Sequence, residues 1–86
     1  MTVMFYGAAL NHTGGEKSFE PKDSSSLHEL INELSCHFGD RLGEYLLGAE
    51  NCFFLVNGKS IAATGGLSTK LQPEDKIEVL PFIEAG

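Results

Sequence analysis

One amphipathic helix in the middle of the chain is the feature that most restricts the folds available to it. Ser26 followed by Glu29 is a capping-box pattern for a helix start, and Gly39 stands where a left-handed residue ends many helices. Between them, apolar residues recur on one helical face, at Leu27, Leu30, Ile31, Leu34 and Phe38. A helix with one apolar face has to cover another layer, so the remaining segments are expected to supply a sheet.

The segments before this helix predict a β-hairpin. Thr2–Gly7 (TVMFYG) is rich in β-branched and aromatic residues and predicts a strand. Glu16–Pro21 alternates weakly between polar and apolar residues, with Phe19 expected to point inward. Asn11–Gly15 (NHTGG), between the two, has the composition of a turn. A shorter helical turn over Asp40–Leu47 is predicted to follow the main helix.

The segments after the helix predict a second hairpin and a final strand. Cys52–Asn57 (CFFLVN) is a compact apolar run typical of a buried strand. Asn57-Gly58 is a type I′ turn signal, and Lys59–Ala62 would be a short return strand. Gln72–Asp75 (QPED) predicts a turn, and Ile77–Phe82 (IEVLPF) predicts the last strand.

The order is therefore β-β-α-β-β-β, an α+β arrangement with a mixed sheet and one main helix packed across one face. The right-handed crossover rule favours placing the first and last strands side by side and parallel at the sheet centre. Pro81 has no N–H to donate, so strand pairing is expected to fail there on at least one side. We expect residues 1–82 to form the domain and residues 83–86 to form a flexible C-terminal tail.

Length and charge narrow the function. A chain of 86 residues with 42% hydrophobic residues forms one small domain, which leaves little room for a deep cleft around a buried catalytic group. Twelve acidic against six basic residues give a net charge of −6, which disfavours nucleic acid and anionic membranes and suits docking on a basic partner. The sequence shows no signal peptide and no membrane-spanning run, and Cys36 and Cys52 suit a reducing cytoplasm.

No internal pattern predicts an active site. His28 and His37 are nine residues apart, which is not the i, i+4 spacing of a metal pair, and His12 lies in a predicted turn. Cys36 is expected at the surface or at its boundary with the core, and Cys52 is expected to be buried as a small hydrophobic residue. Neither Gly-Gly pair is accompanied by the lysine of a phosphate-binding loop. We therefore expect no metal and no bound cofactor.

The C-terminal end is the remaining candidate site. A predicted buried strand runs directly into the last five residues, and a glycine at the end leaves the carboxylate without a neighbouring Cβ, so a narrow channel of another protein can admit it. From Pro81, an extended tail reaches about 16–18 Å. We predict Gly86 as the reacting residue and, as partner-binding residues, Pro81, Phe82, Ile83, Glu84 and Ala85. A merely frayed terminus is the alternative.

Taken together, these features resemble the MoaD/ThiS family of ubiquitin-like sulfur carriers, and especially its MoaD side, the small subunit of molybdopterin synthase. The resemblance runs nearly end to end and rests on the segments TVMFYG, LHELINELSCHF, FLVNGK and LQPEDKIEVLPFIEAG. The positions that fit the family pattern are Leu71, Asp75, Ile77, Pro81 and Gly86, with Phe82 in place of a second proline. Glu74 stands where a turn glycine is usual, and Ala85 stands where the family has the first glycine of its Gly-Gly end.

The resemblance implies a ubiquitin-like β-grasp fold and a carrier rather than an enzyme. An activating enzyme of the MoeB/ThiF type would use ATP to adenylate the Gly86 carboxylate, and a sulfur donor would convert it to a thiocarboxylate. The tail would deliver sulfur to the large subunit of molybdopterin synthase or another acceptor enzyme, with Phe82, Ile83 and nearby apolar sheet residues as the docking patch. Two other functions stay open: a protein modifier joined through Gly86 to a lysine, and a β-grasp binding module without tail chemistry.

Overall fold

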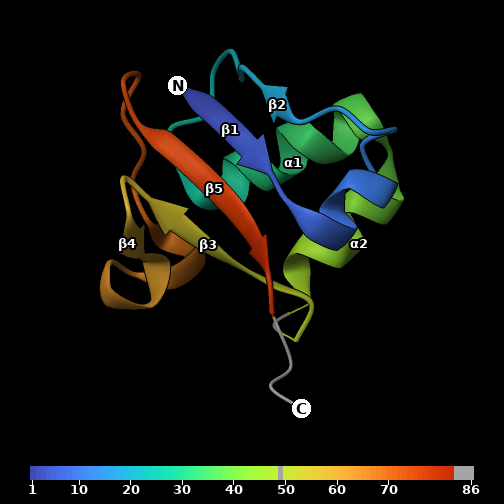
Figure 1. The fold of residues 1–86 in the computed structure, drawn as a ribbon. Helices are drawn as coiled ribbons and strands as arrows, with labels where there is room; N and C mark the ends of the chain where they lie inside the picture. The colour runs from blue at the N-terminus through green and yellow to red at the C-terminus, as the bar shows by residue number, and fades with distance from the viewer. Residues whose placement is uncertain (49, 83–86) are drawn as a thin grey trace.

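A computed structural model describes residues 1–48 and 50–82, in which a five-stranded mixed sheet is covered on one face by two α-helices (Figure 1). The strands are β1 (Thr2–Phe5), β2 (Ser18–Phe19), β3 (Cys52–Val56), β4 (Lys59–Ser60) and β5 (Lys76–Pro81). The helices are α1 (Leu27–Phe38) and α2 (Asp40–Leu47), and three short 3-10 segments are η1 (Gly7–Asn11), η2 (Ile61–Ala63) and η3 (Gly66–Ser68).

The sheet has the order β2-β1-β5-β3-β4, with β1 and β5 parallel at its centre. In this register Val3 lies beside Ile77 and Phe5 lies beside Val79. The outer pairs β1–β2 and β3–β4 are antiparallel hairpins, and β3 also pairs antiparallel with β5. The predicted α+β class, the β-β-α-β-β-β order of strands and main helix along the chain, and the central parallel pair are therefore confirmed.

The core lies between the helical layer and the inner face of the sheet. Along each strand, residues that face the core alternate with residues that face away from it, because successive side chains of a strand point to opposite faces of the sheet. The α1 residues predicted to face the core are buried except Phe38, which is half-buried against it. Each fully buried leucine or isoleucine contributes about 1.5–3 kcal/mol relative to exposure. The largest fully buried side chains are Phe5, Leu27, Leu30, Leu34, Leu42, Ile77, Val3 and Val79.

Helix α1 begins as predicted but with one changed partner. The Ser26 side chain accepts a hydrogen bond from the Glu29 N–H at 3.2 Å, as an N-cap residue does. The Glu29 carboxylate, however, accepts from the N–H and the hydroxyl of Ser25, at 2.9 and 2.8 Å, so the reciprocal half of the capping box is displaced by one residue. At the other end Gly39 has φ 112° and ψ 161°, a positive φ outside the left-handed helical region, because α2 begins at the next residue.

Two predicted strands keep only two residues each in the structure, while β1 and β3 end two residues and one residue earlier than predicted. β2 covers only Ser18–Phe19 of the expected Glu16–Pro21, and β4 ends at Ser60 because the chain turns there into η2. The segment after β1 also differs from the prediction, because the 3-10 segment η1 leads into the predicted turn and buries Ala9 in the core. Short outer strands leave little exposed edge for unwanted pairing.

The β3–β4 connection is the type I′ turn predicted from its sequence. Asn57 and Gly58 both have positive φ, 52° and 83°, as this turn requires. The Asn57 side chain also joins the hairpin to the strand beside it, because its Nδ2 donates to Asp75 Oδ1 at 2.8 Å and its Oδ1 accepts from the Lys76 N–H at 2.9 Å.

Asp75 closes the turn that leads into β5. Its N–H donates to the carbonyl of Gln72 at 3.1 Å, and its Oδ2 accepts from the Gln72 N–H at 2.8 Å. Asn57 is the sole non-glycine residue with positive φ in the described chain, so Glu74 meets this turn without strain although a glycine is usual there. Asn57 and Asp75, two positions of the resemblance, thus hold the fold together.

Candidate functional site

The C-terminal end of β5 is held asymmetrically by its two neighbours. On the β1 side the register ends at Phe5 beside Val79, and the Tyr6 N–H makes one more bond, to the Val79 carbonyl at 3.1 Å. On the β3 side pairing continues to Pro81, which lies opposite Cys52. The expectation that pairing fails at Pro81 on one side is confirmed, and the chain leaves the sheet along β3.

Gly7 makes room for the Pro81 ring where β5 leaves the sheet. A Cβ built on Gly7 would lie 2.6 Å from Pro81 Cγ, closer than real side chains approach, and 3.2 and 3.3 Å from its Cβ and Cδ, which is tight. Gly7 also has φ +63°, a conformation that favours glycine. The proline therefore packs directly on the main chain at the start of η1, and this contact sets the direction in which the chain continues toward Phe82.

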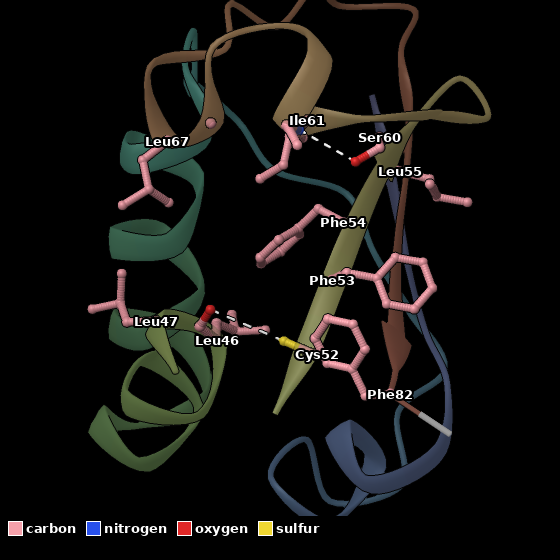
Figure 2. Close-up of a pocket in the computed structure, with 12 residues that line it drawn as sticks. Leu46, Leu47, Cys52, Phe53, Phe54, Leu55, Ser60, Ile61, Leu67 and Phe82 are labelled. Carbon is pink, nitrogen blue, oxygen red and sulfur yellow. Dashed lines mark hydrogen bonds between the residues drawn. The ribbon is translucent and has the colours of Figure 1, made fainter. Parts of the chain in front are cut away.

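Phe82 belongs to an apolar strip, formed with Phe53 and Leu80, at the point where the chain leaves the sheet. Its side chain is 52% exposed, and its ring centre lies 5.2 Å from that of Phe53 on β3. Phe53 is the cross-strand neighbour of Leu80, so Leu80, Phe53 and Phe82 are adjacent on the sheet. Figure 2 shows the Phe53 and Phe82 rings together on one side of β3, with Phe54 pointing to the other.

An open groove of about 660 Å³ extends from Phe82 across β3 toward the helical layer. Phe54 and Cys52 of β3 lie at its buried side, and Ile61 of η2 borders it. Leu47 at the end of α2 and Leu67 in η3 lie on its helical side (Figure 2).

Leu47 and Leu67 are not among the site residues predicted from the sequence. A signal for each exists, because Leu47 lies off the buried α2 face formed by Leu42 and Leu46, and Leu67 is one apolar residue in the polar and glycine-rich run TGGLST. An exposed leucine is common in any protein, so neither signal indicates a site until the fold brings the two together.

Of the predicted site residues, the structure places Pro81 and Phe82 together at the end of β5. Ile83, Glu84, Ala85 and Gly86, including the predicted reacting carboxylate, lie outside the described residues.

The two cysteines are placed as the sequence predicted. Cys36 is exposed on α1, and Cys52 is buried at the start of β3. Burial raises the pKa of the Cys52 thiol to about 11. Its Sγ lies 3.9 and 4.0 Å from the carbonyl oxygens of Tyr45 and Leu46, which accept a weak S–H bond. Cys52 therefore stays protonated near neutral pH and acts as a core residue.

The histidines are dispersed. The His12 ring lies 5.0 Å from the Tyr45 ring, and the His37 ring lies 4.7 Å from that of Phe19, while His28 is exposed. Across residues 1–48 and 50–82, no three His, Cys, Asp or Glu side chains gather as a metal site would require. Over the same residues, no helix has the length and apolar character needed to cross a bilayer.

Comparison with known proteins places this geometry among related folds. The sequence model of the ThiS family matches residues 3–86. No curated protein sequence matches the chain. The chain is 25% identical to a chain of the BexX/CysO complex from Amycolatopsis orientalis, with TM-score 0.83 and coverage of 99% of this chain and 98% of that one.

Two further solved structures have the same fold. CysO from Mycobacterium tuberculosis is 25% identical, with TM-score 0.83 and coverage of 95% of this chain and 98% of that chain. Small archaeal modifier protein 1 from Methanosarcina acetivorans is 21% identical, with TM-score 0.79 and coverage of 99% and 94%; this likeness concerns the fold alone.

Proposed function

The chain belongs to the ThiS family of ubiquitin-like sulfur carriers, and from this premise we propose that Gly86 carries the sulfur as a C-terminal thiocarboxylate. An activating enzyme of the MoeB/ThiF type is the proposed partner for the first step, with ATP as its substrate. The family match supports this proposal because it extends to residue 86 and so includes the C-terminal end.

One structural observation carries the proposal: β5 is followed by Phe82 at an exposed apolar surface. The packing of the Pro81 ring on Gly7 sets the direction in which the chain leaves the sheet, and Phe82 lies half exposed beside Phe53. Four residues follow Phe82, and fully extended they span about 13–14 Å. This length lets a terminal carboxylate enter a partner's active site while the folded domain stays outside.

The proposed chemistry has two steps, and the partners supply the catalytic groups for both. A carboxylate oxygen attacks the α-phosphorus of ATP, the bond to the β-phosphate oxygen breaks, and pyrophosphate leaves. A hydrosulfide-level donor then attacks the carbonyl carbon of the acyl adenylate, and AMP leaves with the former carboxylate oxygen. Adenylation is needed because a free carboxylate has no good leaving group.

The proposal names the sulfur acceptor only as a class of enzyme. The MoaD resemblance suggests the large subunit of molybdopterin synthase, whereas the CysO likeness suggests a different sulfur pathway. We therefore propose an acceptor enzyme that receives the tail in a narrow channel, with the molybdopterin synthase subunit as one candidate. Ala85 is one methyl wider than the usual glycine, so the cognate channel must be correspondingly wider there.

Deletion of Gly86 tests the function. The truncated chain is expected to lose ATP–pyrophosphate exchange by the cognate activating enzyme while its thermal unfolding stays unchanged. Ala85→Gly is the matched control, since it restores the usual family end and should keep full exchange. Normal exchange with the truncated chain would overturn the proposal, and lysine conjugates without a thiocarboxylate would favour the protein modifier instead.

A further inference from the structure

The large apolar side chains that are exposed all belong to one surface. Within the described residues these side chains are Leu47, Leu67 and Phe82, with exposures of 55, 41 and 52%. They come from α2, η3 and the residue after β5, which are distant in sequence, and all three line the groove beside β3. Single exposed leucines are ordinary, but a contiguous apolar surface marks an interaction site.

The groove is chemically uniform. Its lining comes from β3, β4, α2, η2, η3 and Phe82, and among the described residues none that line it is charged (Figure 2). Ser60 supplies the polar side chain of the lining, and its Oγ already accepts from the Ala62 N–H at 3.3 Å. The surface therefore fits an apolar occupant and offers little to a charged or strongly polar one.

The position of the chain end indicates what covers this groove. Phe82 lines the groove, and Gly86 is only four residues, or about 13–14 Å, further along the chain. An enzyme that holds the Gly86 carboxylate in its active site is thus brought against the surface around Phe82. A tether this short places the groove within the footprint of that enzyme, since a standard interface buries about 800 Å² on each partner.

We propose that the groove between β3, Leu47 and Leu67 is a docking site for an apolar segment of the enzyme that activates the C-terminus. This inference rests on the proposed function and extends the contact area from Phe53 and Phe82, which also line the groove, to the helical side of β3. With twelve acidic against six basic residues on the chain, the inserted segment is expected to be apolar at its centre with basic residues around it.

A second copy of the chain is a poorer occupant. Each copy carries a net charge of −6, so two copies repel at low salt, whereas a basic enzyme surface is attracted.

Leu67→Asp tests the docking site, with Ser68→Asp as its matched control. Both changes place one carboxylate in η3, but Ser68 does not line the groove. Leu67→Asp is expected to weaken binding of the cognate activating enzyme about 10-fold or more, measured as Kd by fluorescence anisotropy, and to raise KM in pyrophosphate exchange similarly with kcat unchanged. Ser68→Asp should change each value less than about 3-fold.

Leu47→Gln is the second variant, because glutamine preserves helix propensity at the end of α2. It should weaken binding in the same direction with an unchanged unfolding midpoint. Equal Kd values for the wild type, Leu67→Asp and Leu47→Gln would overturn the docking site, as would a dimer that both variants dissociate without any effect on enzyme binding.

The two proposals fail in different ways. Wild-type chain that binds the enzyme but is never adenylated contradicts the proposed function, while the Kd comparison still decides the docking site. Adenylation of all variants with the same KM keeps the proposed function and rejects the docking site. Absence of any binding by the wild type rejects both.

Discussion

Gly7→Ala is expected to destabilise the chain more than any other glycine-to-alanine change at a comparable φ. Two costs add at Gly7: its φ of +63° disfavours any residue with a Cβ, and that Cβ would lie 2.6 Å from Pro81 Cγ. Gly14 separates the φ cost from the cost of steric overlap, because its φ is +65° but no heavy atom lies within 4 Å of the corresponding Cβ.

The magnitudes follow from these two geometries. A left-handed conformation costs an alanine about 1–2 kcal/mol, which is the expected loss for Gly14→Ala. Forcing a methyl group against a packed ring adds about 1–3 kcal/mol, so Gly7→Ala should lose roughly 2–5 kcal/mol in all. A domain of this size has only about 3–5 kcal/mol to lose, so the unfolding curves should be recorded in urea with a stabilising osmolyte present.

A double-mutant cycle with Pro81→Ala isolates the contact. When the ring is absent, Gly7→Ala should cost little more than Gly14→Ala, since the φ penalty remains, the overlap with Cγ is gone, and only the 3.2 Å approach to Cβ of residue 81 is left. The free energy of unfolding from urea titration is the measurement. Equal losses for Gly7→Ala and Gly14→Ala in the wild-type background would refute the claim that the Gly7–Pro81 contact sets the exit of β5.

Three other predictions concern groups that the structure places outside the chemistry. Asp75→Ala should lower the free energy of unfolding by about 2–3 kcal/mol, because Asp75 is buried and accepts two hydrogen bonds of 2.8 Å, one of them from Asn57. Urea titration measures this loss, and a loss below about 0.5 kcal/mol would contradict the prediction. Iodoacetamide at pH 8 should modify Cys36 and spare Cys52, since burial raises the Cys52 pKa to about 11; intact mass should show one adduct before and two after unfolding, and two adducts on the folded chain would refute the assignment. Burial alone would raise the pKa of Glu33, but hydrogen bonds from two backbone N–H groups and a serine hydroxyl lower the pKa below 4.5. The stabilisation from Glu33 is therefore present above pH 4.5 and is lost as the pH falls through the folded-state pKa. Glu33→Gln should reduce the loss of unfolding free energy at acid pH, and an unchanged loss would argue against these hydrogen bonds.

The elements that were predictable from sequence are those fixed by local physics. The N-cap at Ser26 and the apolar period of α1 are short-range signals, and the positive φ values of Asn57 and Gly58 follow from the residues themselves. The parallel pairing of β1 with β5 followed from the order of elements, because few topologies satisfy the right-handed crossover rule.

The features that the sequence did not predict depend on tertiary contacts, except for the local hydrogen bonding of Glu29. η1 carries Ala9 into the core immediately after β1, and its five residues GAALN show too short a pattern to distinguish from a turn. The Glu29 carboxylate accepts hydrogen bonds from Ser25 rather than from Ser26, because both the N–H and the hydroxyl of Ser25 are within reach. The sequence does not reveal the groove, because Leu47, Leu67 and Phe82 come to line one surface only after folding.

The most direct test of the central claim is the intact mass of the wild-type chain after incubation with its activating enzyme, ATP and a sulfur source. Replacement of one carboxylate oxygen of Gly86 by sulfur predicts a gain of about 16 Da that disappears when Gly86 is deleted. An unchanged mass under conditions in which the enzyme turns over ATP with this chain would contradict the account.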